Sequence, residues 1–198
     1  MAEAQIKLGV EIESELRNRG ADFVFFTDIS HSNQIVEDEF NATESKTDQL
    51  ADVMVDYLTL KGYSAFSQSE NNLYSTGSYN ESTKTSTLPH KTIAIMAGLG
   101  WIGKHNLLVS SESGSAISMC TVLTDAPLKT VSHPPASPEC GECTVCRDIC
   151  PVQVIKGTTW SMGIARDELV DVYRCTMCLK CLALCPWTQN YLERKQMK

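Results

Sequence analysis

Several features that would assign this chain to common classes are missing. The first 20 residues lack a basic start followed by an apolar run, which is the pattern of a secretory signal. No stretch approaches the roughly 18 apolar residues that a membrane span needs. The GxSxG, HExxH and Walker patterns are absent as well. We therefore expect a cytoplasmic protein with no membrane association and none of these common catalytic motifs.

An excess of positive charge is also missing. The formal net charge of the 198 residues is −7. A surface of this sign repels phosphate backbones, so we expect no nucleic-acid partner. The hydrophobic content of 42% is that of an ordinary globular protein, which can bury a core without help from cross-links.

Cysteine, by contrast, is abundant and strongly patterned. Eight of the nine cysteines form two copies of the run C-x2-C-x2-C-x3-C-P, which is typical of bacterial ferredoxins. In such runs the fourth cysteine binds the other cluster of the pair. The sequence thus predicts two [4Fe–4S] clusters with crossed ligands. The first set is Cys140, Cys143, Cys146 and Cys185, and the second is Cys175, Cys178, Cys181 and Cys150.

Disulfides and zinc are the alternatives for these eight cysteines. Disulfides need an oxidising compartment, which the lack of a secretion signal argues against. Zinc sites use two CxxC pairs and need neither the third cysteine nor the Cys-Pro ending. The ninth cysteine, Cys120, lies in an alternating segment that predicts a strand, where we expect it to act as a small buried hydrophobe.

The remaining pattern predicts an α/β (α+β) fold. We expect helices over 3–19, around 50–58 and from Pro89 to Met96, and strands over 21–27, 63–66 and 107–110. Residues 67–88, rich in Ser, Asn, Thr and Gly, predict a long loop. Prolines after residue 126 mark a linker. We therefore divide the chain into a cofactor-binding domain, 1–135, and a ferredoxin-type domain, 136–198.

A glycine-rich segment, AGLGWIGKH, precedes the linker. It matches GxGxxG, but a helix is predicted before it and a strand after it, the reverse of a dinucleotide site. The alternatives are a structural tight turn and a loop that approaches a bound cofactor. The residues alone leave both alternatives open, with His105 as a candidate to line a cofactor pocket. Of the other histidines, His90 is a second candidate to line this pocket, whereas His31 and His133 receive no role.

Taken together, LPHKTIAIMAGLGWIGKHNLLV, TVLTDAPL, CGECTVCRDICP and CPWT resemble the epoxyqueuosine reductase family, which is related to the corrinoid reductive dehalogenases. The resemblance covers roughly residues 84–190. It implies a nitroreductase-like, cobalamin-binding N-terminal domain and a ferredoxin-like module that delivers electrons. By this resemblance, the residues that bind the cofactor are Gly98, Gly100, Trp101, Ile102, Gly103, Lys104 and His105.

Two positions depart from the family pattern. The family has an aspartate in a VDSAP-like stretch upstream of AGLG, where this chain has Thr83 to Ser86. The asparagine that usually follows GWIGK is His105 here. We therefore do not expect this chain to reduce the tRNA base, and the catalytic residues are not identified.

Two functions remain in view. One is an oxidoreductase whose clusters reduce a cobalamin, or alternatively a flavin such as FMN, that acts on a small-molecule or corrinoid substrate. The other is an electron carrier or reductive activator that docks on a partner enzyme and holds no organic cofactor. Both need a redox partner protein, and a homodimer is one way to complete the pocket of so short an N-terminal domain.

Overall fold

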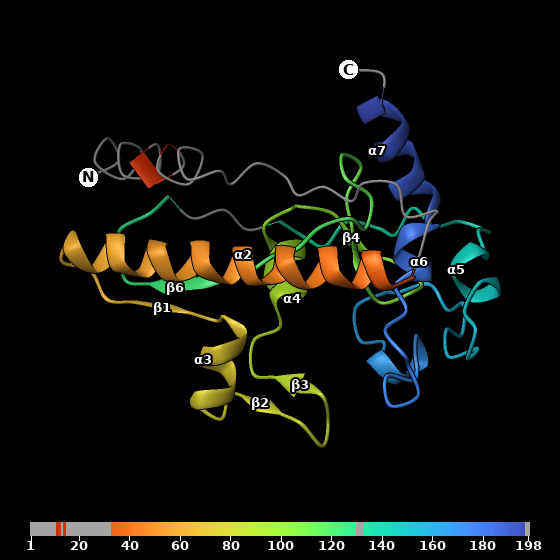
Figure 1. Cartoon of the computed structure of the whole chain (residues 1–198), viewed down its shortest axis with the longest axis horizontal. Coiled ribbons are helices and arrows are strands. Elements are labelled where there is room, and N and C mark those ends of the chain that lie inside the picture. The colour runs from red at the N-terminus through yellow and green to blue at the C-terminus, as the bar shows by residue number, and fades with distance from the viewer. Residues whose placement is uncertain (1–10, 13, 15–32, 130–132, 197–198) are drawn as a thin grey trace. The chain divides into compact units, whose positions relative to one another are not determined.

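The computed structural model describes residues 11–12, 14, 33–129 and 133–196 (Figure 1). The helix expected over 3–19 and the strand over 21–27 lie largely or wholly outside these residues, as does His31. The described elements, in chain order, are α2 (Asn33–Leu60), β1 (Ala65–Ser67), α3 (Glu70–Ser75), β2 (Tyr79–Asn80), β3 (Thr85–Ser86), α4 (His90–Met96), β4 (Trp101–Ile102), β5 (Leu108–Val109), β6 (Val122–Thr124), α5 (Val145–Asp148), the 3-10 helix η1 (Arg166–Glu168), α6 (Lys180–Ala183) and α7 (Pro186–Gln196).

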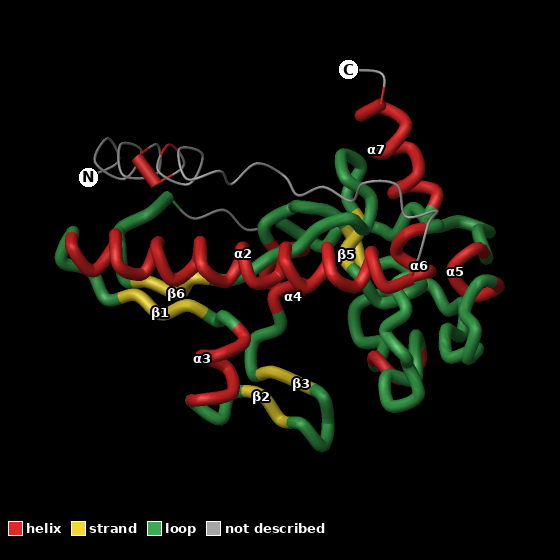
Figure 2. The backbone as a smooth tube through the Cα atoms, in the orientation of Figure 1, coloured by secondary structure: helices red, strands yellow, loops and turns green. Residues whose placement is uncertain are grey.

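The described strands are short and pair only antiparallel, in three two-stranded sheets, β1–β6, β2–β3 and β4–β5 (Figure 2). The expected mixture of helices and strands is confirmed. None of the described helices has both the length and the apolar character needed to cross a membrane.

The chain forms two compact units. Unit 1 comprises 1–24, 40–90 and 118–131, and unit 2 comprises 25–39, 91–117 and 132–198. The glycine-rich segment and all eight cysteines of the two runs thus fall in unit 2. The division into domains at residue 135 stays a prediction.

In unit 1, α2 supplies the core through Ala51, Met54 and Leu58, which are buried and share one helix face. The helix ends at Leu60, and Gly62 follows it with a positive φ of +88°. The Tyr63 N–H donates to Leu58 O and the Gly62 N–H to Thr59 O, the bond pattern of a Schellman motif.

The expectation of one long loop over 67–88 is wrong. This segment contains α3 and the β2–β3 hairpin. Contacts to distant side chains organise it, because the Glu70 N–H donates to Asp48 of α2 at 2.8 Å. The rings of Tyr74 and Tyr79 pack edge to face at 5.2 Å between centroids. Composition could not reveal either contact.

In unit 2, the expected strand near 107–110 pairs with a strand inside the glycine-rich segment, so that β4 and β5 form a hairpin. Its four strand residues are buried. Trp101 packs edge to face on Trp187 at the start of α7, with centroids 5.0 Å apart. A second hydrophobic cluster surrounds Cys146 and contains Val154, Ile155 and Val170.

The hairpin requires glycine at position 100. Gly100 has φ of +155°, and a Cβ atom built there would lie 1.9 Å from the carbonyl oxygen of Val109. Backbone of the facing strand cannot move aside without breaking the pairing. We predict that Gly100→Ala destabilises the protein by about 2 to 4 kcal/mol.

Gly77→Ala is the matched control. Gly77 also has positive φ, +68°, but nothing lies within 4 Å of the position that an added Cβ atom would take. Its substitution should cost about 1 kcal/mol, the backbone cost alone. Thermal unfolding followed by circular dichroism compares the two variants. Equal losses would show that the Gly100–Val109 approach is not a constraint.

Candidate metal centre

The two cysteine runs lie in unit 2 on short helical turns. α5 carries Cys146, and α6 carries Cys181, while the other six cysteines of the runs lie in the segments that flank these helices. Prolines follow Cys150 and Cys185, and Pro186 opens α7. In each run, the third cysteine thus lies on a short helix, and a proline follows the fourth cysteine.

Four thiols surround one cavity of about 220 Å³. Cys140, Cys143 and Cys146 come from the first run, and Cys185 comes from the second. This is the crossed set that the sequence predicts for one cluster. The other lining residues are Lys104, His105, Glu139, Pro186 and Trp187.

Electrostatics also link these four thiols. Burial raises the pKa of the Cys146 thiol to about 11, and the negative charges of Cys140, Cys143 and Cys185 add to this shift. With no cation bound, the Cys146 thiol therefore holds its proton at neutral pH. A cationic group that binds the thiolates removes this cost, and such binding releases protons.

Cys181 and Cys150, which the sequence assigns to the second set, have thiol pKa values shifted in opposite directions. Burial raises the pKa of Cys181 to about 12, with further contributions from Cys146, Cys178 and Cys175. Burial also acts to raise the pKa of Cys150, but backbone N–H groups outweigh it and lower the pKa overall. The donors belong to Val152, Gln153, Val154 and Ile155. The lowered pKa of Cys150 favours its thiolate form.

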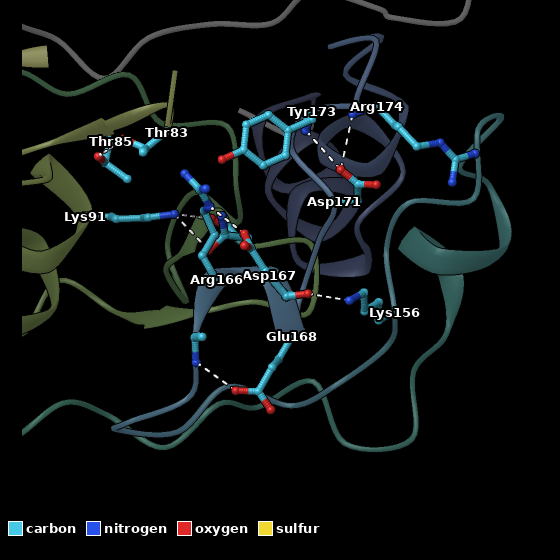
Figure 3. A network of polar contacts seen from close by, with 12 residues as sticks. Thr83, Thr85, Lys91, Lys156, Arg166, Asp167, Glu168, Asp171, Tyr173 and Arg174 are labelled. Atoms are coloured by element: carbon cyan, nitrogen blue, oxygen red, sulfur yellow. Dashed lines mark hydrogen bonds and ion pairs between the residues drawn. The ribbon is translucent and has the colours of Figure 1, made fainter. Parts of the chain in front are cut away.

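The segment between the runs is held by local polar contacts (Figure 3). The Asp171 carboxylate accepts from the backbone N–H groups of Tyr173 and Arg174, and the Lys156 ammonium donates to Asp167 O (Figure 3). Ile155 and Val170 form an isolated antiparallel bridge. The two hydrogen bonds to Asp171 fix the chain directly before Cys175.

The glycine-rich segment reaches the cavity through two side chains, Lys104 and His105. The Lys104 ammonium donates to Gly141 O at 2.6 Å and to Cys143 O at 3.1 Å. Both carbonyls belong to the turn that carries the first cysteines. The hairpin therefore supports the ligand turn directly.

His105 is buried and neutral beside the same cavity. Burial lowers its pKa to about 4, and the charge of Lys91 adds to the shift. The Leu107 N–H donates to Nδ1 at 3.2 Å, so the ring proton is on Nε2, which donates to Ser115 Oγ at 2.9 Å. The Ser115 N–H in turn donates to Thr188 Oγ1, beside Trp187 in α7.

The glycines of this segment make close approaches to the chain itself. A Cβ atom at Gly98 would meet the His133 ring at 3.0 Å, and one at Gly103 would meet His105 Cε1 at 2.7 Å. Trp101 and Ile102 are buried as well. These contacts are those of a structural turn. The cofactor-binding role of Gly98, Gly100, Trp101, Ile102, Gly103, Lys104 and His105 stays a prediction.

Sequence reasoning missed several contributors to the site. Trp187 and Thr188 tie the residues after Cys185 to the hairpin, and the CPWT string was the available signal. Lys91 was also missed. Its ammonium donates to the backbone and side-chain oxygens of Asn106 in the hairpin turn, and burial lowers its pKa to about 8, with a smaller effect from Arg166.

His90 and Cys120 lie in unit 1. His90 Nδ1 is 2.9 Å from Thr121 Oγ1, and a role in a cofactor pocket stays a prediction. Cys120 precedes β6 instead of lying within it, and it is half-buried. The prediction that Cys120 lies inside a strand is therefore wrong. The strand begins two residues later, at Val122, where the pairing with β1 begins.

Solved structures of two kinds of reductase share the fold of this chain. The chain matches the catabolic reductive dehalogenase NpRdhA with a TM-score of 0.54 and 24% identity, over 72% of this chain and 21% of that one. An epoxyqueuosine reductase bound to a modified tRNA stem loop matches with a TM-score of 0.50 and 19% identity, over 76% and 39% of the chains.

Curated relatives named epoxyqueuosine reductase match about half of this chain. The chain is 33% identical to epoxyqueuosine reductase of Synechococcus sp. over 120 residues, 52% of this chain and 37% of the relative. It is 32% identical to that of Escherichia coli over 114 residues, 50% of this chain and 30% of the relative. No family model matches. The resemblance to epoxyqueuosine reductases is confirmed over about half of this chain, which spans about a third of the length of these relatives.

The environment of Cys120 generates a pH prediction. Burial raises its pKa from the usual 9.0 to about 12, and the charge of Asp48 adds to the effect. The folded protein thus keeps the thiol protonated between pH 9 and 12, where the unfolded chain ionises. The stability that this thiol contributes is complete below pH 9 and is lost as the pH rises toward 12.

Alkylation of the metal-loaded protein by iodoacetamide, read by mass spectrometry, checks this. The labelling rate of Cys120 should still be rising steeply above pH 10, because the thiolate is the nucleophile. In the unfolded chain the rate should level off above pH 9. A folded-state midpoint at or below pH 9 would contradict the prediction and reopen a redox role for this cysteine.

Proposed function

We propose that this chain is an iron–sulfur oxidoreductase whose cysteine runs hold two [4Fe–4S] clusters in a ferredoxin-like module. The single observation that carries the proposal is the cavity bounded by Cys140, Cys143, Cys146 and Cys185. Thiols from both runs meet there, which is the crossed ligation of two-cluster ferredoxins. Cys175, Cys178, Cys181 and Cys150 would hold the second cluster.

The cavity fits a cluster better than a single ion. Tetrahedral zinc, with Zn–S distances of about 2.3 Å, needs sulfur atoms about 3.8 Å apart. Among the described residues, no three His, Cys, Asp or Glu side chains are grouped closely enough for one metal ion. The four thiols instead line a volume several times that of a water molecule, about 30 Å³.

The backbone N–H groups around Cys150 support the same assignment. Hydrogen bonds to cluster sulfurs are among the features that set cluster potentials. The hydrophobic cluster of Val154, Ile155 and Val170 packs beside Cys146, with Cys150 and Cys181 at its edge. These residues would exclude water from the space between the two ligand sets and lower the local dielectric constant.

When bound, the clusters would supply single electrons to a cobalamin, or alternatively a flavin such as FMN, held by the N-terminal part of the chain. The support for cobalamin is the fold shared with a reductive dehalogenase that is described in connection with B12-dependent dehalogenation, at a TM-score of 0.55 and 22% identity. The substrate would be a small molecule or a corrinoid, and a redox partner protein would supply the electrons. A homodimer would complete the pocket.

One observation favours a second function, an electron carrier without an organic cofactor. The glycines at 98, 100 and 103 are accounted for by contacts within the chain. No bound corrin or flavin is needed to explain them. In that case the chain would dock on a partner enzyme and pass its electrons outward.

Metal and cofactor analysis of anaerobically reconstituted protein tests the proposal. We predict about eight irons per chain, with one cobalt or one flavin if the chain is a reductase and neither if it is a carrier. Cys143→Ser should lower the iron content to about four, because it removes a ligand of only one cluster. Cys120→Ser is the control and should retain about eight.

Two results would contradict the proposal. Wild-type protein that binds one zinc per cysteine run, with no sulfide and no visible absorption, would make the cysteines structural. Iron retained in full by Cys143→Ser would remove Cys143 from the ligand set.

A further inference from the structure

Lys104 places a cation against the candidate cluster cavity. The residue is 8% exposed, and its ammonium reaches the Gly141 and Cys143 carbonyls from the β4–β5 hairpin, 37 and 39 residues earlier in the chain. A buried charge is costly unless it is hydrogen-bonded or paired. Two carbonyl oxygens offset part of that cost.

No other described residue offsets the remaining cost of burying the Lys104 charge. An ammonium has three donors, and the contacts of Lys104 with described residues use two of them. None of the ion pairs between described residues includes Lys104. Its side chain lines the same cavity as the four thiols. A negatively charged group in that cavity would accept the third hydrogen bond.

We propose that Lys104 is a positioning residue that fixes the turn carrying Cys140 and Cys143 and raises the reduction potential of the cluster bound there. The inference rests on the proposed function. Thiolate ligands already make a bound cluster anionic, and its reduction adds one more negative charge. A fixed, buried cation stabilises that charge more than water-screened ones do.

The chain offers a matched control in Lys156. Its ammonium also donates to a backbone carbonyl, that of Asp167, in the same unit. Lys156 is exposed and does not line the cavity. Solvent and salt screen a charge of this kind. Removing it should leave both cluster potentials unchanged.

The test is an anaerobic potentiometric titration of the reconstituted full chain, read by electron paramagnetic resonance. Lys104→Met should make one of the two clusters harder to reduce, with a reduced-to-oxidised ratio at fixed potential about tenfold lower, which is about 59 mV for one electron. The second cluster should change much less. Lys104→Arg, which keeps the charge, should stay within about threefold of wild type, and Lys156→Met should match wild type.

If Lys104→Met assembles its clusters poorly, its iron content is compared with that of Lys104→Arg. Loss of about half the iron in Lys104→Met but not in Lys104→Arg supports the positioning role. Equal loss in both variants, or two fully assembled clusters with unshifted potentials in Lys104→Met, overturns the proposal.

A wild-type chain that assembles no cubane cluster overturns the proposed function itself. Wild-type clusters that are present but indifferent to Lys104 overturn this inference alone.

Discussion

The position of Cys185 is the constraint on which the rest of unit 2 depends. This thiol belongs to the second run, yet it must face Cys140, Cys143 and Cys146 of the first. Directly after it, Trp187 packs on Trp101, and Thr188 accepts a hydrogen bond from the Ser115 backbone. The start of α7 is thus anchored on the β4–β5 hairpin, and this anchoring holds Cys185 at the cavity.

The same hairpin supports the opposite wall of the cavity. Lys104 holds the carbonyls of the turn at Gly141 and Cys143, and His105 connects through Ser115 to Thr188. The glycine-rich segment and the cysteine runs therefore form one structural assembly. Through Trp101 and Lys104, the GWIGK residues contact chain segments next to cysteines of both runs, which gives a physical reason for the occurrence of the two motifs together.

Much of this was predictable from the sequence. The spacing of the cysteines predicts two crossed ligand sets, which stay a prediction, and the four thiols of the first set line one cavity. The apolar spacing of Met54 and Leu58 predicted the C-terminal part of α2, which begins much earlier, at Asn33. The glycine-rich segment was rightly placed between a helix and a strand. Each of these predictions rests on residues that are close in sequence or on a ligand pattern with one known geometry.

The sequence-based predictions failed mainly where contacts between distant residues determine the structure. Asp48 on α2 organises the segment that contains α3, and Tyr74 and Tyr79 pair within it, so a stretch with the composition of a loop is structured. The contact of Lys104 with the Gly141 and Cys143 carbonyls crosses from one motif to another. Local periodicity carries no information about such contacts, whereas the buried charge of Lys104 becomes apparent only when the fold is known.

Iron-edge anomalous diffraction from crystals grown without oxygen tests the central claim most directly. The account predicts anomalous density for a four-iron group in the cavity, bonded to Cys140, Cys143, Cys146 and Cys185, with the Lys104 ammonium beside it. Density for a single metal ion would contradict the account. So would a cluster held by Cys185 together with Cys175, Cys178 and Cys181, because the two runs would then not be crossed.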